Sequence, residues 1–255
     1  MASYYLEILF LSLIQGVSEF VPVSSSAHLV LFSKISEFNF SSLEVDVSLH
    51  LGSLFAILIY FWKDLKNVFK NRYLLNLIFF GSIPLIIFGF IFFKFGLINI
   101  FRDLKIIAWT TLIFGIILFF ADKKAENKNL KRDLNLKNIT IIGFYQVLAL
   151  IPGVSRSGII ITISRILNFN RVDAVKISFF LSIPALSGAS ILSLSNISER
   201  DFELGIVVVL CSFFSFIFSF LTIKFLLFYL QKFSLKIFVY YRLFLSFILF
   251  IIAYA

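Results

Sequence analysis

The sequence predicts an all-α integral membrane protein with six transmembrane helices and two re-entrant pairs of broken helices. The first observation behind this prediction is composition: 60% of the 255 residues are hydrophobic and only 15% are charged. An average soluble domain has about 25% charged residues. The mean hydropathy of +1.00 agrees, so a soluble fold is excluded. The other two observations are a set of long apolar stretches and two apolar stretches with polar interruptions.

Six stretches are long and apolar enough to cross a bilayer, because about 20 helical residues cover its hydrocarbon core. Each is bounded by charged or polar residues. We expect transmembrane helices near 45–62, 73–93, 105–121, 177–195, 204–228 and 235–254.

A seventh apolar stretch, near 5–33, is interrupted in its middle. Pro22 removes a helical hydrogen bond and disfavours a helical conformation for the residue before it. Ser24, Ser25 and Ser26 follow, and serine is a good N-cap for a new helix. The chain should therefore break near Pro22 and restart as a second short helix.

The eighth stretch, near 138–168, has the same organisation. Pro152 and Gly153 break it, and Ser155 is placed to cap the helix that follows. Each piece of the two stretches is about half as long as a helix that crosses the membrane.

The distribution of basic residues indicates that both broken stretches turn back rather than cross. If both turn back, one side of the membrane carries fourteen Lys and Arg in its loops and the other side carries four. If the second stretch crossed, the division would be eleven to seven, a weaker match to the positive-inside rule. The loops on the basic side are 63–72, 122–137, 169–176 and 229–236.

This topology gives one integral membrane domain, 1–255, built as an inverted repeat. The approximate repeats are 1–121 and 138–255, joined by a cytoplasmic loop at 122–137, and both termini lie outside the cytoplasm. In such folds the broken helices meet at the repeat interface and form the binding site. The two interruptions are therefore the expected place of the binding site.

Polar side chains gather around the first interruption. Gln15 and Glu19 are four residues apart and share a helix face, and His28 lies on the helix that restarts. Intramembrane ionisable residues are costly and usually functional. Folding back could bring His28 near Glu19, a pairing suited to acid-base or nucleophilic chemistry. A pair that only holds two helices together is the alternative.

The second interruption continues with Ser155, Arg156 and Ser157 at the start of a helix. A helix N-terminus attracts anions, and arginine can hold phosphate with two hydrogen bonds. Two such N-termini with an arginine and several hydroxyls suit a diphosphate better than a lone carboxylate. A structural ion pair between Arg156 and Glu19 is the alternative.

Other chemistry has little support in the sequence. The net charge of +9 lies mainly in short loops between apolar runs, which indicates topology rather than nucleic-acid binding. No zinc motif and no P-loop occurs. We interpret Arg165 and Arg171 as anchors at the membrane interface, and His50 as an interfacial residue at the start of a span.

The motifs resemble those of a known family. The run from Gln15 to His28 is similar to the (E/Q)xxxE motif and the serine and histidine segment of bacterial undecaprenyl-diphosphate phosphatases, the bacitracin-resistance type. The run from Pro152 to Gly158 is similar to their PGxSRSxxT motif, and the similarity extends along most of the chain. One position departs, because Ile160 stands where the family has a threonine.

The resemblance implies an enzyme of the bacterial cell membrane that hydrolyses undecaprenyl diphosphate and so recycles the lipid carrier for cell-wall synthesis. It implies catalytic roles for Glu19, Ser25, His28 and Arg156. It also implies a divalent cation, Mg²⁺ or Ca²⁺, near Glu19. The residues expected to bind the substrate phosphates are Gln15, Ser24, Ser26, Gly153, Ser155 and Ser157.

Several alternatives stay open at this stage. The nucleophile is Ser25, His28 or a water molecule. A transporter or lipid flippase could use the same inverted-repeat scaffold, since it needs an anion site but no nucleophile with a base. The expected partners are the lipid diphosphate and membrane lipid, and we expect no nucleic acid. The sequence is also compatible with a homodimer. We expect the site to open to the outer side.

Overall fold

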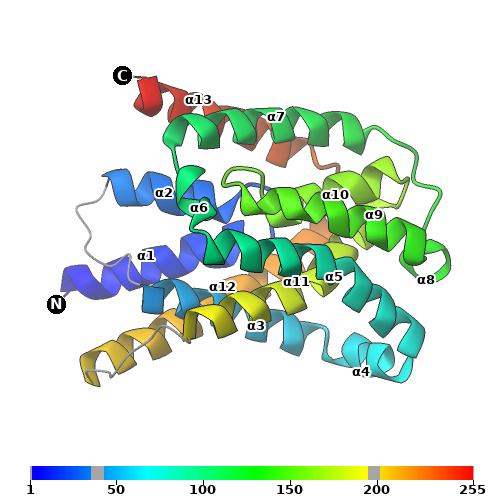
Figure 1. The fold of residues 1–255 in the computed structure, drawn as a ribbon, viewed down its shortest axis with the longest axis horizontal. Coiled ribbons are helices and arrows are strands. Elements are labelled where there is room, and N and C mark those ends of the chain that lie inside the picture. Colours follow the sequence, from blue (N-terminus) through cyan, green and yellow to red (C-terminus); the bar gives the residue numbers. More distant parts are fainter. Residues whose placement is uncertain (1, 36–42, 195–201, 255) are drawn as a thin grey trace.

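The computed structural model describes residues 2–35, 43–194 and 202–254, and in these ranges the chain consists of helices joined by short turns and loops (Figure 1). Lys128 and Phe169 form an isolated β-bridge. The all-α class is confirmed. The helices are α1 Ala2–Ser18, α2 Ser25–Ile35, α3 Leu43–Tyr60, α4 Trp62–Lys70, α5 Arg72–Lys94, α6 Leu97–Ile100, α7 Leu104–Asp122, α8 Leu130–Asp133, α9 Leu136–Gln146, the 3-10 helix η1 Val147–Leu150, α10 Arg156–Ile166, α11 Arg171–Leu194, α12 Phe202–Tyr229 and α13 Lys236–Tyr254.

Five of the described helices are long and apolar enough to cross a membrane: α5, α7, α11, α12 and α13. They correspond to five of the six expected spans. The sixth, α3, contributes a shorter apolar segment, Val45–Tyr60. The broken stretches supply two more short apolar segments, Leu6–Ser18 and Leu136–Leu150.

Two expected boundaries are corrected. The segment 63–72, expected as a loop, is mostly the amphipathic helix α4, because Leu65 packs into the core while Lys63 and Lys66 face outward. Helix α11 begins at Arg171, six residues before the expected span. The expected loop at 196–203, with Arg200, lies almost wholly outside the described residues.

Both broken stretches form helical hairpins. Helices α1 and α2 contact each other, as do α9 and α10, and in each hairpin the second helix runs back towards the end where the first began (Figure 1). Both termini of the chain lie at one end of the bundle, whereas α4 and α8 lie at the opposite end. The two hairpins enter from opposite ends, so their tips meet in the middle.

The helices of the two halves pack in matching pairs. Helix α1 packs on α12. In the other half, α9 takes the place of α1 and packs on α5, which takes the place of α12. Helix α3 packs on α11, and α7 packs on α13. The pairing of each hairpin's first helix is therefore repeated in the two halves, whereas α10 packs on α7 and α11 and, among the described residues, α2 does not pack on its equivalent helices to the same extent.

Small residues allow some of these helices to approach closely, as in many membrane helix interfaces. At Gly143 on α9, an added Cβ would lie 2.3 Å from the carbonyl oxygen of Gly81 on α5. Between α3 and α12, the hydroxyl of Ser53 contacts those of Ser215 and Ser219 at 3.2 and 3.0 Å. Close backbone approach thus holds the scaffold around the hairpins.

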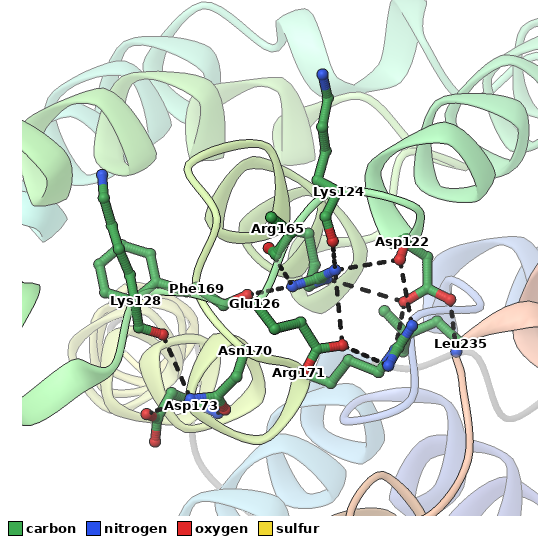
Figure 2. Close-up of polar contacts among 11 residues, drawn as sticks. Asp122, Lys124, Glu126, Lys128, Arg165, Phe169, Asn170, Arg171, Asp173 and Leu235 are labelled. Atoms are coloured by element: carbon green, nitrogen blue, oxygen red, sulfur yellow. Dashed lines mark hydrogen bonds and ion pairs between the residues drawn. The ribbon is translucent and has the colours of Figure 1, made fainter.

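A charged cluster ties the loops together at the end of the bundle opposite the termini (Figure 2). Arg165, expected at the membrane interface, is instead fully buried and donates to the backbone carbonyls of residues 122, 124, 125 and 169. Arg171 donates to the Asp122 carboxylate at 2.6 Å and pairs with Glu126. Asp122 also accepts from the backbone N–H of Leu235.

The interface role expected for Arg165 is therefore wrong, because its side chain is buried, whereas that of the partly exposed Arg171 stays a prediction. The carbonyls at the end of α7 and in the following loop have no helical donors of their own, and the two guanidinium groups satisfy them or hold the adjacent carboxylates. The cluster joins the segment between the repeats to both halves of the bundle.

The contact between α9 and α5 predicts the effect of a small substitution. Gly143→Ala should lower the free energy of unfolding by about 1–3 kcal/mol, because the added methyl group overlaps the Gly81 carbonyl and forces the helices apart. Gly188→Ala is the control, since its added Cβ meets no heavy atom within 4 Å. Unfolding in mixed micelles, titrated with SDS, measures both; equal stability of the two variants would contradict the packing described.

Candidate active site

The first helix break is built around an unusual backbone residue and an aromatic anchor. Helix α1 ends at Ser18, and α2 begins at Ser25 after Ser24, which has a φ of 78°. The Ser24 hydroxyl accepts a hydrogen bond from the N–H of Ala27, as an N-cap does. Phe20, in the turn, is fully buried and meets Phe179 of α11 edge to face at 5.4 Å.

The second break repeats this construction. Ser155 has a φ of 69°, and its hydroxyl accepts from the N–H of Gly158 at 3.1 Å, capping α10. Gly153 has a φ of 90°, and a Cβ there would lie 2.1 Å from the Thr110 hydroxyl. Only glycine fits this position. The predicted breaks and both serine caps are confirmed.

The two hairpin tips bond to each other through matching serines. The Ser26 hydroxyl, two residues after the first cap, accepts from the N–H of Gly153 at 3.4 Å. The Ser157 hydroxyl, two residues after the second cap, donates to the carbonyl of Val21 at 3.0 Å. Each hairpin thus satisfies a backbone group in the break of the other, as buried polar groups require.

Arg242 of α13 holds both breaks together. Its guanidinium is buried and donates to the carbonyls of Gly153 at 2.8 Å, Val154 at 3.1 Å and Pro22 at 3.4 Å. Its Nε also donates to the carbonyl of Thr111 on α7 at 3.3 Å. An arginine has five N–H donors in a fixed plane, which suits several carbonyls at once. The sequence-based prediction did not include Arg242, although an arginine inside the expected span 235–254 is a signal that could have identified it.

Glu19 lies where the two breaks meet and receives three donors. Its Oε1 pairs with Arg156 at 2.5 Å. Its Oε2 accepts from the Gln15 amide at 2.9 Å and from the Ser25 hydroxyl at 3.1 Å. Arg156 also donates to the carbonyl of Ser182 on α11 at 3.1 Å. The carboxylate therefore joins both motifs and contacts the hydroxyl expected to act as nucleophile.

A cavity of about 770 Å³ opens over this carboxylate. Its polar lining comes from both helix starts and from α3, whereas α2, α5 and α11 add apolar walls. The size suits part of a large ligand with an apolar portion. The polar residues in the lining are Glu19, Ser24, Ser25, Ser26, Asp46, His50, Arg102, Ser155 and Arg156.

Four predicted site residues do not belong to this lining. Gln15 is fully buried behind Glu19, and Ser157 is buried against Val21. The N–H of Gly153 donates to the Ser26 hydroxyl, and its carbonyl accepts from Arg242. These three support the cavity wall.

His28 is the fourth, and its expected pairing with Glu19 is wrong. Its Nδ1 bonds the carbonyl of Ser24 and its Nε2 bonds the hydroxyl of Tyr241, each at 2.6 Å. The ring is instead held between the start of α2 and Tyr241 of α13, with which it also stacks, so it is not directed at Glu19.

His50 was expected at the membrane interface, and this interpretation is also wrong. Its Nδ1 lies 2.9 Å from the Gln15 amide nitrogen, and the ring lines the cavity. Asp46, four residues earlier on the same face of α3, lines it too. The i, i+4 spacing of Asp46 and His50 in a predicted span was a signal that could have identified both.

The described residues do not form a resident metal site. They contain no group of three or more His, Cys, Asp or Glu placed to hold a cation. Among the residues that the structure describes, Glu19 is the one acidic residue at the meeting point of the breaks, and its two oxygens already accept from Arg156, Gln15 and Ser25.

The fold and this site define a helical membrane protein with a charged, hydroxyl-lined cavity at the meeting point of two helix breaks. The family profile described as "Bacitracin resistance protein BacA" matches residues 8–248. The chain belongs to this family.

Proteins named undecaprenyl-diphosphatase are similar to the chain over nearly its whole length. The one from Pelagibacter ubique (strain HTCC1062) is 54% identical over all of both chains. The one from Elusimicrobium minutum (strain Pei191) is 40% identical over 95% of this chain and 96% of its own. The one from Thermodesulfovibrio yellowstonii is 39% identical over 95% of each.

The position of Arg242 predicts a large effect on stability. Arg242→Met should lower the free energy of unfolding by about 2–5 kcal/mol, because carbonyls in both breaks lose a buried charged donor. Arg132→Met, which removes an exposed ion pair, should change it by less than about 0.5 kcal/mol. Unfolding titrations in mixed micelles compare the two, and similar values for both would refute the role assigned to Arg242.

Proposed function

We propose that this protein hydrolyses undecaprenyl diphosphate to undecaprenyl phosphate and inorganic phosphate, and so recycles the lipid carrier used in cell-wall synthesis. The observation that carries the proposal is the contact between the Ser25 hydroxyl and the Glu19 carboxylate, beside Arg156 and two helix N-termini. Family membership and the printed names of the relatives support the substrate.

Binding of the diphosphate uses the positive groups around the cavity. Arg156 has five N–H donors, and contacts to Glu19 and Ser182 occupy two of its nitrogens, so further N–H groups can reach phosphate oxygens. The starts of α2 and α10 add the positive ends of two helix dipoles. Ser24, Ser26 and Ser155 line the same region and can donate hydroxyl hydrogen bonds. The isoprenoid chain would lie along the apolar walls.

The chemical step transfers the terminal phosphoryl group. The oxygen of Ser25 attacks the terminal phosphorus, its proton passes to Glu19, and the bond from that phosphorus to the bridging oxygen breaks to release undecaprenyl phosphate. Water then cleaves the seryl phosphate and returns free Ser25 and inorganic phosphate. Arg156 stabilises charge on the transferred group, where positioning and electrostatics dominate catalysis. We assign His28 to holding the Ser24 carbonyl at the start of α2.

For the membrane arrangement we propose six spans and two re-entrant hairpins in an inverted repeat. The matched helix pairings and the hairpins entering from opposite ends support it. The basic loops then face the cytoplasm, and both termini and the cavity mouth face the outer side of the bacterial cell membrane. A dianionic headgroup could reach Glu19 and Arg156 from that side.

A lipid carrier on the same scaffold is the rival function. A carrier needs the anion site but has no use for a hydroxyl paired with a carboxylate, so the contact between Ser25 and Glu19 favours hydrolysis. Phosphate release from a long-chain isoprenyl diphosphate in detergent, measured beside the movement of labelled lipid across liposomes, separates the two.

The assignment predicts that Arg156→Ala and Glu19→Ala each lower phosphate release by about 10²-fold or more, because the transferred group loses its stabilising charge or Ser25 loses its base. Purified, monodisperse protein in detergent is assayed with undecaprenyl diphosphate. Lys66→Ala, in α4 at the far end of the bundle, is the control and should retain full turnover. Near-normal turnover of either site variant would overturn the assignment.

We also propose that Mg²⁺ or Ca²⁺ supports activity when it enters with the substrate. Glu19 would be its protein ligand, and the cation would neutralise charge on the diphosphate, since Mg²⁺ commonly binds through one or two carboxylates plus substrate phosphates. Dialysis against EDTA should remove activity, and either ion should restore it. Full turnover after exhaustive chelation would refute the need for a cation.

A further inference from the structure

The buried amide of Gln15 links the cavity carboxylate to a histidine on another helix. Its nitrogen lies 2.9 Å from the Glu19 Oε2 and 2.9 Å from the His50 Nδ1. Gln15 belongs to α1 and His50 to α3, so the contact crosses between helices. Gln15 is fully buried, and water is not expected to replace either partner.

The chemistry of the three groups fixes their orientation. A carboxylate only accepts hydrogen bonds, so the amide atom facing Glu19 must be the nitrogen. That nitrogen carries two hydrogens, and the second points to His50 Nδ1, which must accept. His50 is therefore neutral and carries its proton on Nε2. In the described residues the Gln15 Oε1 has no hydrogen-bond partner, so it does not help to hold the amide.

Without His50, the side chain of Gln15 would keep one partner among the described residues, the Glu19 carboxylate. Glu19 would then be held by an amide whose orientation no second partner fixes, and by Arg156 and Ser25, the two groups that change during the reaction. Arg156 must turn donors towards phosphate, and Ser25 must lose its proton. Gln15 is the one donor to Glu19 that takes no part in the chemistry, and His50 orients it.

We propose that His50 is a positioning residue for the hydrolysis, acting through Gln15 to keep the Glu19 carboxylate aimed at Ser25. This inference rests on the proposed function. His50 would contribute by orienting a reacting group, the Glu19 carboxylate. Small displacements of such a group can lower the rate by a large factor. His50 should therefore act on kcat more than on KM.

The test compares His50→Asn with His50→Leu, two side chains of similar size. The Asn carbonyl oxygen can take the place of the imidazole Nδ1 as acceptor, whereas Leu has none. We expect the Leu variant to lose about tenfold or more in kcat with KM within about twofold, because substrate binding is left in place. The Asn variant should recover to within about threefold of the original chain.

A second measurement asks whether His50 acts through Gln15. In a Gln15→Met background the amide is gone, so adding His50→Leu should lower kcat by less than about twofold further, the non-additivity expected of coupled residues. An equal loss in both backgrounds would show that His50 acts by another route.

The outcomes separate this inference from the proposed function. Failure of the unaltered protein to release phosphate refutes the proposed function. Normal turnover of the unaltered protein together with normal kcat for His50→Leu refutes only the role of His50, as does an Asn variant as slow as the Leu variant. If His50→Leu is not monodisperse in detergent, His50→Ala replaces it in the same comparison.

Discussion

The guanidinium of Arg242 is the group on which the rest of this structure depends. Two helical stretches are broken inside the bundle, and each break exposes backbone carbonyls that need donors from elsewhere in the chain. Arg242 donates to the carbonyls of Pro22, Gly153 and Val154, so one side chain serves both breaks. A buried arginine is costly in itself, and its five donors make that cost tolerable only where several carbonyls converge.

With the breaks secured, the hairpin tips can carry polar side chains towards each other. Ser26 and Ser157 each bond the backbone of the other break, and the pair formed by Glu19 and Arg156 joins the two motifs across the same interface. The groups that build the interface and the groups that face the cavity are therefore neighbours in sequence. This is why Gln15, Gly153 and Ser157, which share the motifs, support the wall instead of lining it.

Arginines have different surroundings at the loop end of the bundle and at its centre. At the loop end, Arg165 and Arg171 are satisfied by carbonyls and by Asp122 and Glu126, and the cluster closes the loops over the helices. At the centre, Arg156 keeps donors directed to an open cavity. The first arrangement is complete without a ligand, whereas the second leaves room for an anion. Hydrolysis and the role proposed for His50 both rest on that difference.

The sequence by itself determined the helical class, the two breaks and their serine caps, because proline, glycine and serine act on the backbone within a few residues. Residue type and spacing also pointed to Glu19 and Arg156, and the family resemblance to Ser25, and the structure brings these three residues to one cavity. Only the tertiary structure decided which groups meet: His28 turns to Tyr241, Arg165 is buried, and His50 and Arg242 reach the site from distant helices. Such contacts depend on helix rotation and packing, which local patterns do not specify.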